Sequence, residues 1–132
     1  MPRRRLEPGT PADWLARARG NLLLARQPKP EGAFWEDLCF QAQQAAEKAL
    51  KAVLIHRGIA FHKIHSIEVL LDIMPSDLTV NEKLRAAAML TDYAVACRYP
   101  GEYPPVTEQE YKHSLRLAER VVDWAEKTLT AG

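Results

Sequence analysis

Residues 39–54 read CFQAQQAAEKALKAVL, and the expected architecture follows mainly from them. Small and apolar residues recur along this stretch at the spacings of three and four that place side chains on one side of a helix. They are Cys39, Ala42, Ala45, Ala46, Ala49, Leu50, Ala52 and Val53, with Leu38 just before the stretch. Rows of small residues let two helix backbones approach closely. The stretch therefore predicts a long helix from about Phe34 to Arg57, packed tightly against a neighbour.

Leu54 and Ile55 leave the end of this helix apolar on more than one side. A helix buried on two faces in so short a chain lies either at the centre of its own bundle or in a dimer interface. Closed two-fold pairs are the commonest assembly of small soluble proteins, so we expect a homodimer.

Cap and breaker residues predict four further helices. Thr10, Thr79 and Thr107 each precede an acidic residue by three positions, as helix N-caps often do. The expected helices cover about residues 11–27, 66–74, 80–99 and 108–128. Short connections favour antiparallel packing of successive helices, and no strand-like alternation occurs. The predicted fold class is all-α: an up-and-down antiparallel helical bundle of about five helices, one of them short.

The composition is that of a folded globular chain. Apolar residues make up 47% and charged residues 27% of the 132 residues, and the net charge of +1 excludes a large uniform field for nucleic acid. We expect a flexible basic arm over residues 1–9 and a single domain over 10–132. No stretch has the pattern of an export signal or a membrane span, so we expect a cytoplasmic protein and no membrane partner.

Cysteine and histidine spacings do not favour a metal. Cys39 and Cys97 lack a Cys-x-x-Cys spacing and lie among apolar residues, which predicts buried thiols. His56, His62 and His65 lie on both sides of Gly58 without helical ligand spacing. We therefore expect no metal site and no cofactor, and we expect His65 to cap the start of the helix over 66–74.

Two runs of residues together resemble the signature of prokaryotic HEPN domains. The first is Cys39 to Leu54 followed by Gly58, His65 and the Leu70-Leu71 pair, and the second is Leu90-Thr91-Asp92-Tyr93 followed by Arg98-Tyr99-Pro100. The resemblance implies a compact helical bundle, commonly dimeric, found in prokaryotes beside a minimal nucleotidyltransferase. Such pairs are regarded as toxin and antitoxin. The HEPN member is then a metal-independent ribonuclease or a nucleotide-binding partner.

The nuclease motif of that family is an Arg followed, after four to six residues, by a His. Arg98 matches the Arg, but Tyr103 stands where the His would, and His113 is too far along. Cleavage of RNA without a metal needs proton transfer and a cation at the phosphate. Arg98 suits the cation, whereas Tyr103, with an ordinary pKa of about 10, donates a proton more readily than it accepts one. Asp92 is a candidate to orient Arg98 across a dimer.

Each of these candidate residues also has a structural interpretation. Arg98 could satisfy the last carbonyls of its helix, and Tyr99 could bond to Asp92 seven residues earlier. Glu47 and Lys51 form an i, i+4 pair, for which a solvated helix face is the simpler interpretation. If that face borders the Arg98 cleft, Lys48 and Lys51 supply the positive charge for a nucleotide or RNA.

Two functions from different classes follow from the resemblance. The first is a toxin that cleaves RNA at a dimer cleft through Arg98. The second is a non-catalytic module that binds a nucleotide or its nucleotidyltransferase antitoxin, and the missing motif His favours this second function. Tyr103 is also a candidate acceptor for nucleotidylation by that partner. A purely structural helical dimer is a third alternative.

Overall fold

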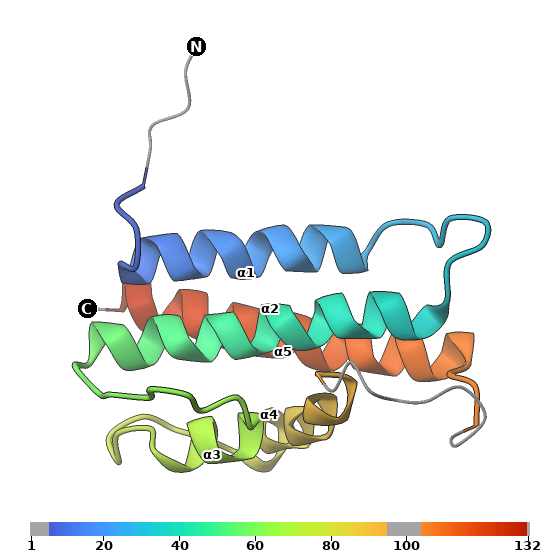
Figure 1. The fold of residues 1–132 in the computed structure, drawn as a ribbon. Helices are drawn as coiled ribbons and strands as arrows, with labels where there is room; N and C mark the ends of the chain where they lie inside the picture. Colours follow the sequence, from blue (N-terminus) through green and yellow to red (C-terminus); the bar gives the residue numbers. More distant parts are fainter. Residues whose placement is uncertain (1–5, 95–103, 132) are drawn as a thin grey trace.

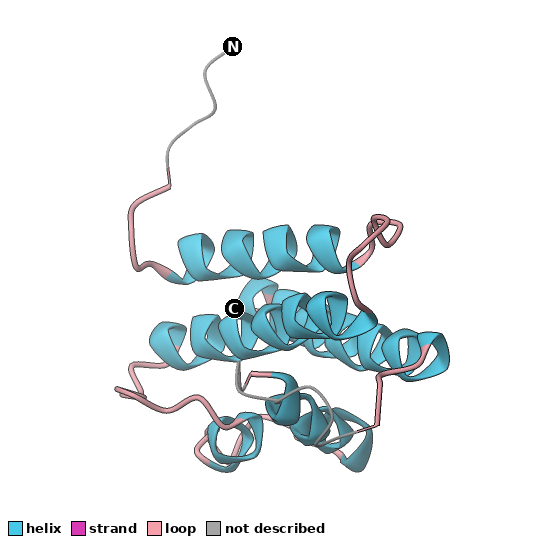
Figure 2. Cartoon of the chain, turned by 45° about the vertical axis from the view of Figure 1, so that its right-hand side comes forward, coloured by secondary structure: helices cyan, strands magenta, loops and turns pink. Residues whose placement is uncertain are grey.

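The computed structural model describes residues 6–94 and 104–131. Within them the chain forms five α-helices and one 3-10 helix and contains no strand, which confirms the predicted all-α class (Figure 2). The elements are α1 (Pro11–Ala25), α2 (Trp35–His56), α3 (Ile67–Asp72), α4 (Glu82–Arg85), the 3-10 helix η1 (Ala86–Tyr93) and α5 (Glu108–Thr130).

The long helix α2 lies at the centre of the bundle. It packs against α1, α5, η1 and α3, and Figure 1 shows α1 on one side of it and the short helices on the other. Its alanine rows are fully buried, as predicted, and so is Leu54. Because the chain itself covers the apolar end of α2, that end does not by itself require a second copy.

Successive segments of the bundle alternate in direction, and the short helices together form the segment that follows α2. Helix α1 is antiparallel to α2, whereas α2 and α5 run in the same direction (Figure 1). Trp35 at the start of α2 stacks on Tyr111 near the start of α5, with ring centroids 5.0 Å apart. In the sequence, the segment from α3 to η1 stands between these two helices, and it runs in the opposite direction to both (Figure 1).

Two of the three predicted threonine caps are present. Thr10 accepts a hydrogen bond from the backbone N–H of Asp13, and Thr107 accepts one from that of Glu110. The third prediction is wrong, because the cap of α4 is Asn81, whose Oδ1 accepts from the N–H of Leu84 at 2.9 Å. Thr79 lies before the helix, where its carbonyl accepts from the indole of Trp124.

The expected helix over 80–99 is not one regular helix. It divides at Arg85 into α4 and the more tightly wound η1, and its last residues, with Cys97, lie outside the described part of the chain. Cys39 is buried, as predicted. No helix in the described part of the chain is long and apolar enough to cross a membrane.

Candidate functional site

A row of polar side chains runs through the buried part of α2. Gln43, Glu47 and Lys51 follow one another at intervals of four residues, and they are only 0%, 6% and 5% exposed. The prediction of a solvated face for Glu47 and Lys51 is therefore wrong. The physical reason is tertiary: the rings of Trp14 and Phe61 lie over Lys51, and the loop before α3 reaches Glu47.

Each polar group in this row has a partner. Gln43 Nε2 donates to Glu47 Oε1 at 2.9 Å, and Lys51 Nζ donates to Glu47 Oε2 at 2.9 Å. The Lys51 ammonium also lies over two aromatic rings, 5.8 Å from the centroid of Trp14 and 5.3 Å from that of Phe61. Buried charges are tolerated when they are paired and hydrogen-bonded, so the row is internally satisfied.

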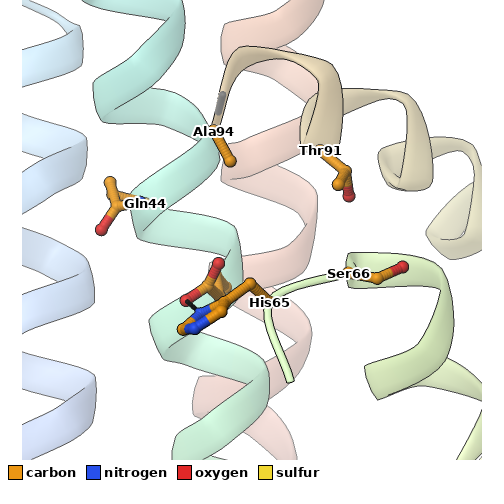
Figure 3. A pocket seen from close by; sticks show the side chains of 6 residues that line it. Gln44, His65, Ser66, Thr91 and Ala94 are labelled. Carbon is orange, nitrogen blue, oxygen red and sulfur yellow. Dashed lines mark hydrogen bonds and ion pairs between the residues drawn. The ribbon is translucent and has the colours of Figure 1, made fainter. Parts of the chain in front are cut away.

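His65 reaches the row from the loop before α3. Its Nδ1 lies 3.2 Å from Glu47 Oε2, yet its side chain is 68% exposed against 8% for Glu47. The expectation that His65 caps α3 is wrong, because Ser66 is the cap and accepts from the N–H of Val69. In Figure 3 the imidazole lies over α2, with its hydrogen bond drawn as a dashed line.

The charge of Glu47 is fixed by this environment. Burial alone would raise the pKa of the carboxyl group, but hydrogen bonds from Lys51, Gln43 and His65 together hold its pKa below the ordinary value. Each of these donors stabilises the ionised form. Glu47 is therefore a carboxylate at neutral pH, and it acts only as a hydrogen-bond acceptor.

An open pocket of about 400 Å³ lies beside this cluster. Its lining residues are Gln44, Glu47, His65, Ser66, Thr91 and Ala94. Figure 3 shows Gln44 on α2, Ser66 at the start of α3, and Thr91 and Ala94 at the end of η1. The hydroxyl oxygen of Ser66 accepts a hydrogen bond from the backbone N–H of Val69. That of Thr91 accepts one from the backbone N–H of Ile67. Their O–H groups remain able to donate to a ligand.

Of the predicted catalytic residues, Arg98 and Tyr103 lie outside the described residues, as does Tyr99. Asp92 is exposed on η1, next to the pocket-lining Thr91. The last described residue before the gap is Ala94, which lines the pocket four positions before Arg98 along the chain.

The two lysines predicted to bind a nucleotide do not line the pocket. Lys51 is buried against Glu47, and Lys48 Nζ donates to Asn21 Oδ1 of α1 at 2.8 Å. Burial, followed by the charge of Arg17, lowers the pKa of Lys48. Binding of a nucleotide by these lysines stays a prediction. In the described part of the chain, no three His, Cys, Asp or Glu side chains gather in a way that could hold a metal ion.

Comparison with known proteins agrees with this fold. The HEPN domain family model matches residues 11–128. The crystal structure of TT1696 from Thermus thermophilus is similar at 38% identity and a TM-score of 0.77, covering 89% of this chain and 97% of that one. An archaeal HEPN homologue is similar at 31% identity and a TM-score of 0.70, covering 89% and 95% respectively. No curated protein matches the chain significantly. The match over nearly the whole bundle shows that the chain belongs to the HEPN domain family.

Proposed function

We propose that this protein is the HEPN component of a prokaryotic toxin–antitoxin pair with a minimal nucleotidyltransferase, and that its pocket receives an RNA phosphodiester. The supporting observation is the polar pocket formed by α2, the start of α3 and the end of η1. It presents an exposed imidazole and two hydroxyl donors at the point where the chain continues towards Arg98. In this proposal Arg98 supplies the cation for the phosphate, without a metal.

The groups of the pocket are suited to a sugar-phosphate ligand. The hydroxyls of Ser66 and Thr91 can donate to phosphate oxygens, and the Gln44 side chain can bind a ribose or base edge. Within the described lining there is no lysine or arginine. Arg98 is therefore needed for affinity in this proposal, and its removal should weaken binding.

A non-catalytic binding module is the second candidate. It is favoured because Tyr103 replaces the motif His and because the charge of Lys51 is already neutralised by Glu47. Such a module would hold a nucleotide or the nucleotidyltransferase itself, and Tyr103 would be the acceptor for nucleotidylation. Incubating both proteins with ATP and measuring the mass of the peptide that contains Tyr103 tests this candidate. An unchanged mass counts against modification.

We propose a cytoplasmic homodimer. Support for a second copy comes from Leu23 and Leu24, which are 58% and 53% exposed on α1. Exposed neighbouring leucines are costly in water and are commonly covered by association. Light scattering of the purified chain tests this, and a clean monomer would exclude the dimer.

Induced expression tests the ribonuclease proposal. Wild type is expected to arrest growth and deplete RNA, and Arg98→Ala is expected to do neither. Arg116→Ala, an exposed arginine of α5, is the matched control and should behave as wild type. Tyr103→Phe separates a role of the phenol from that of the guanidinium. Growth without RNA loss in the wild type would contradict the ribonuclease proposal.

A further inference from the structure

We infer that His65 is the proton acceptor of the site and that Glu47 is a positioning residue that holds its ring. This inference rests on the proposed function, because it requires an RNA strand in the pocket. It assigns this role to an imidazole from the loop before α3, in a chain whose Arg98 motif has Tyr103 in place of the His. The hydrogen bond between Nδ1 of His65 and Oε2 of Glu47 is the contact that carries it.

The contact with Glu47 determines which ring nitrogen is free. An ionised carboxylate can only accept a hydrogen bond, so Nδ1 of His65 must carry the hydrogen. A neutral imidazole then has its lone pair on Nε2. Lys51 Nζ lies 3.5 Å from the same Nδ1, but its shorter contact is with Glu47 at 2.9 Å. The charged groups that contact the ring in the described part of the chain thus favour one tautomer.

The position of the carboxylate is fixed by the core. Glu47 is held from one side by Gln43, which in turn accepts from Gln44, and from the other side by Lys51. The ammonium of Lys51 is itself enclosed by the rings of Trp14 and Phe61, which meet edge to face at 5.9 Å. A catalytic group is effective when its supporting contacts are themselves fixed.

The exposure of the two residues fits a reactive group on a buried support. The carboxylate is almost inaccessible, whereas the imidazole is 68% exposed and lines the pocket with Ser66 and Thr91. The hydrogen bond thus holds the ring against α2 while the rest of the imidazole stays open to a ligand.

The step assigned to His65 is the removal of the proton from a ribose 2′-hydroxyl by Nε2. The 2′-oxygen then bonds to the adjacent phosphorus, and the bond from phosphorus to the 5′-oxygen breaks. The leaving 5′-oxygen takes a proton from water, and the hydroxide formed takes the proton from His65. The products are a 2′,3′-cyclic phosphate and a 5′-hydroxyl, without net oxidation or reduction. The hydroxyls of Ser66 and Thr91 donate to the phosphate oxygens.

Cleavage of a fluorescent RNA oligonucleotide in EDTA, with the purified full-length chain, tests this role. His65→Ala should lower kcat by about 10²- to 10⁴-fold, the usual contribution of a general base. It should still bind the 2′-deoxy oligonucleotide, which cannot be cleaved by this route. His62→Ala is the matched control, since His62 is exposed in the same loop and lies outside the pocket lining, and it should cleave as wild type does.

A spectroscopic measurement tests the positioning role of Glu47. Nitrogen-15 NMR of the neutral His65 ring should show the hydrogen on Nδ1 in the wild type, and a hydrogen on Nε2 would overturn the inference. Glu47→Gln should lose this single tautomer and lower kcat while leaving KM nearly unchanged. A merely structural role would instead lower the folded fraction and leave the tautomer and kcat of the folded enzyme unchanged.

The outcomes separate the inference from the function on which it rests. If wild type cleaves RNA and His65→Ala cleaves it equally well, His65 is not the base and the proposed function stands. If wild type neither binds the 2′-deoxy oligonucleotide nor cleaves RNA, the proposed function fails and the role of His65 fails with it.

Discussion

Nδ1 of His65 lies 3.2 Å from Oε2 of Glu47, so a loop residue is tied to the centre of α2 across 18 positions of sequence. The carboxylate at the other end of this contact also holds the buried ammonium of Lys51. One side chain therefore serves both the packing of the core and the orientation of the imidazole. The stability of the fold and the geometry of the pocket are linked at Glu47.

Removing Glu47 should be costly unless Lys51 is removed with it. Glu47→Leu leaves a buried ammonium without its partner, and we expect a loss of about 3–5 kcal/mol in the free energy of unfolding. Adding Lys51→Met should restore most of that loss, because two apolar side chains suit the buried row. Urea denaturation of both single variants and the double variant measures the coupling. Additive losses would show that the two residues do not interact.

The depressed pKa of Glu47 predicts how stability depends on pH. The folded chain binds this proton less readily than the unfolded chain, whose ordinary pKa is 4.5. The contribution of the carboxylate is thus complete above that pH and is lost as the pH falls through the lower folded pKa. We expect the stability difference between wild type and Glu47→Gln to shrink on acidification, as followed by urea denaturation. Glu31→Gln, in an exposed loop, should follow wild type at every pH.

The cap of α4 can be tested by a pair of alanine variants. Asn81→Ala removes the acceptor for the N–H of Leu84 and should lower the free energy of unfolding by about 1 kcal/mol. Thr79→Ala, at the position that the sequence favoured, should change it by less than about 0.5 kcal/mol. Thermal unfolding compares the two directly. An equal loss in both variants would contradict the assignment of the cap.

Two glycines in open space should respond to alanine with opposite signs. Gly58 has φ of +71°, and Gly20 lies inside α1, yet no atom within 4 Å would meet an added Cβ at either position. Gly58→Ala should destabilise by about 1–2 kcal/mol because of the left-handed backbone alone. Gly20→Ala should stabilise by up to about 1 kcal/mol because alanine favours the helix. Thermal unfolding that shifts both variants in the same direction would contradict this account.

Local patterns predicted the fold well because they are set by neighbouring residues. The alanine rows of α2 and the caps at Thr10 and Thr107 lie where the sequence indicated. At α4 two candidate caps, Thr79 and Asn81, stand two positions apart; Asn81 is the cap, and the backbone carbonyl of Thr79 instead accepts from the indole of Trp124. Such a contact cannot be read from spacing.

Neither the burial of the polar row nor the position of His65 follows from the sequence pattern. Alanines lie on one side of the row in α2, but Gln44 and Lys48 lie on the other, and the row is covered by Trp14 and Phe61 from other parts of the chain. The position of His65 depends likewise on the path of the loop after Gly58. No periodicity in the sequence fixes that path.

In the described part of the chain, the short helices and their loops lie on the side of α2 opposite to α1 (Figure 1). The carboxylate belongs to the central helix, whereas the imidazole belongs to a connection whose Ile59, Phe61 and Ile64 also pack against the core. Lengthening or shortening residues 57–66 would therefore disturb the ring of Phe61 over Lys51 as well as the contact of His65 with Glu47. The loop that presents the imidazole is thus anchored by the same packing that covers the buried ammonium.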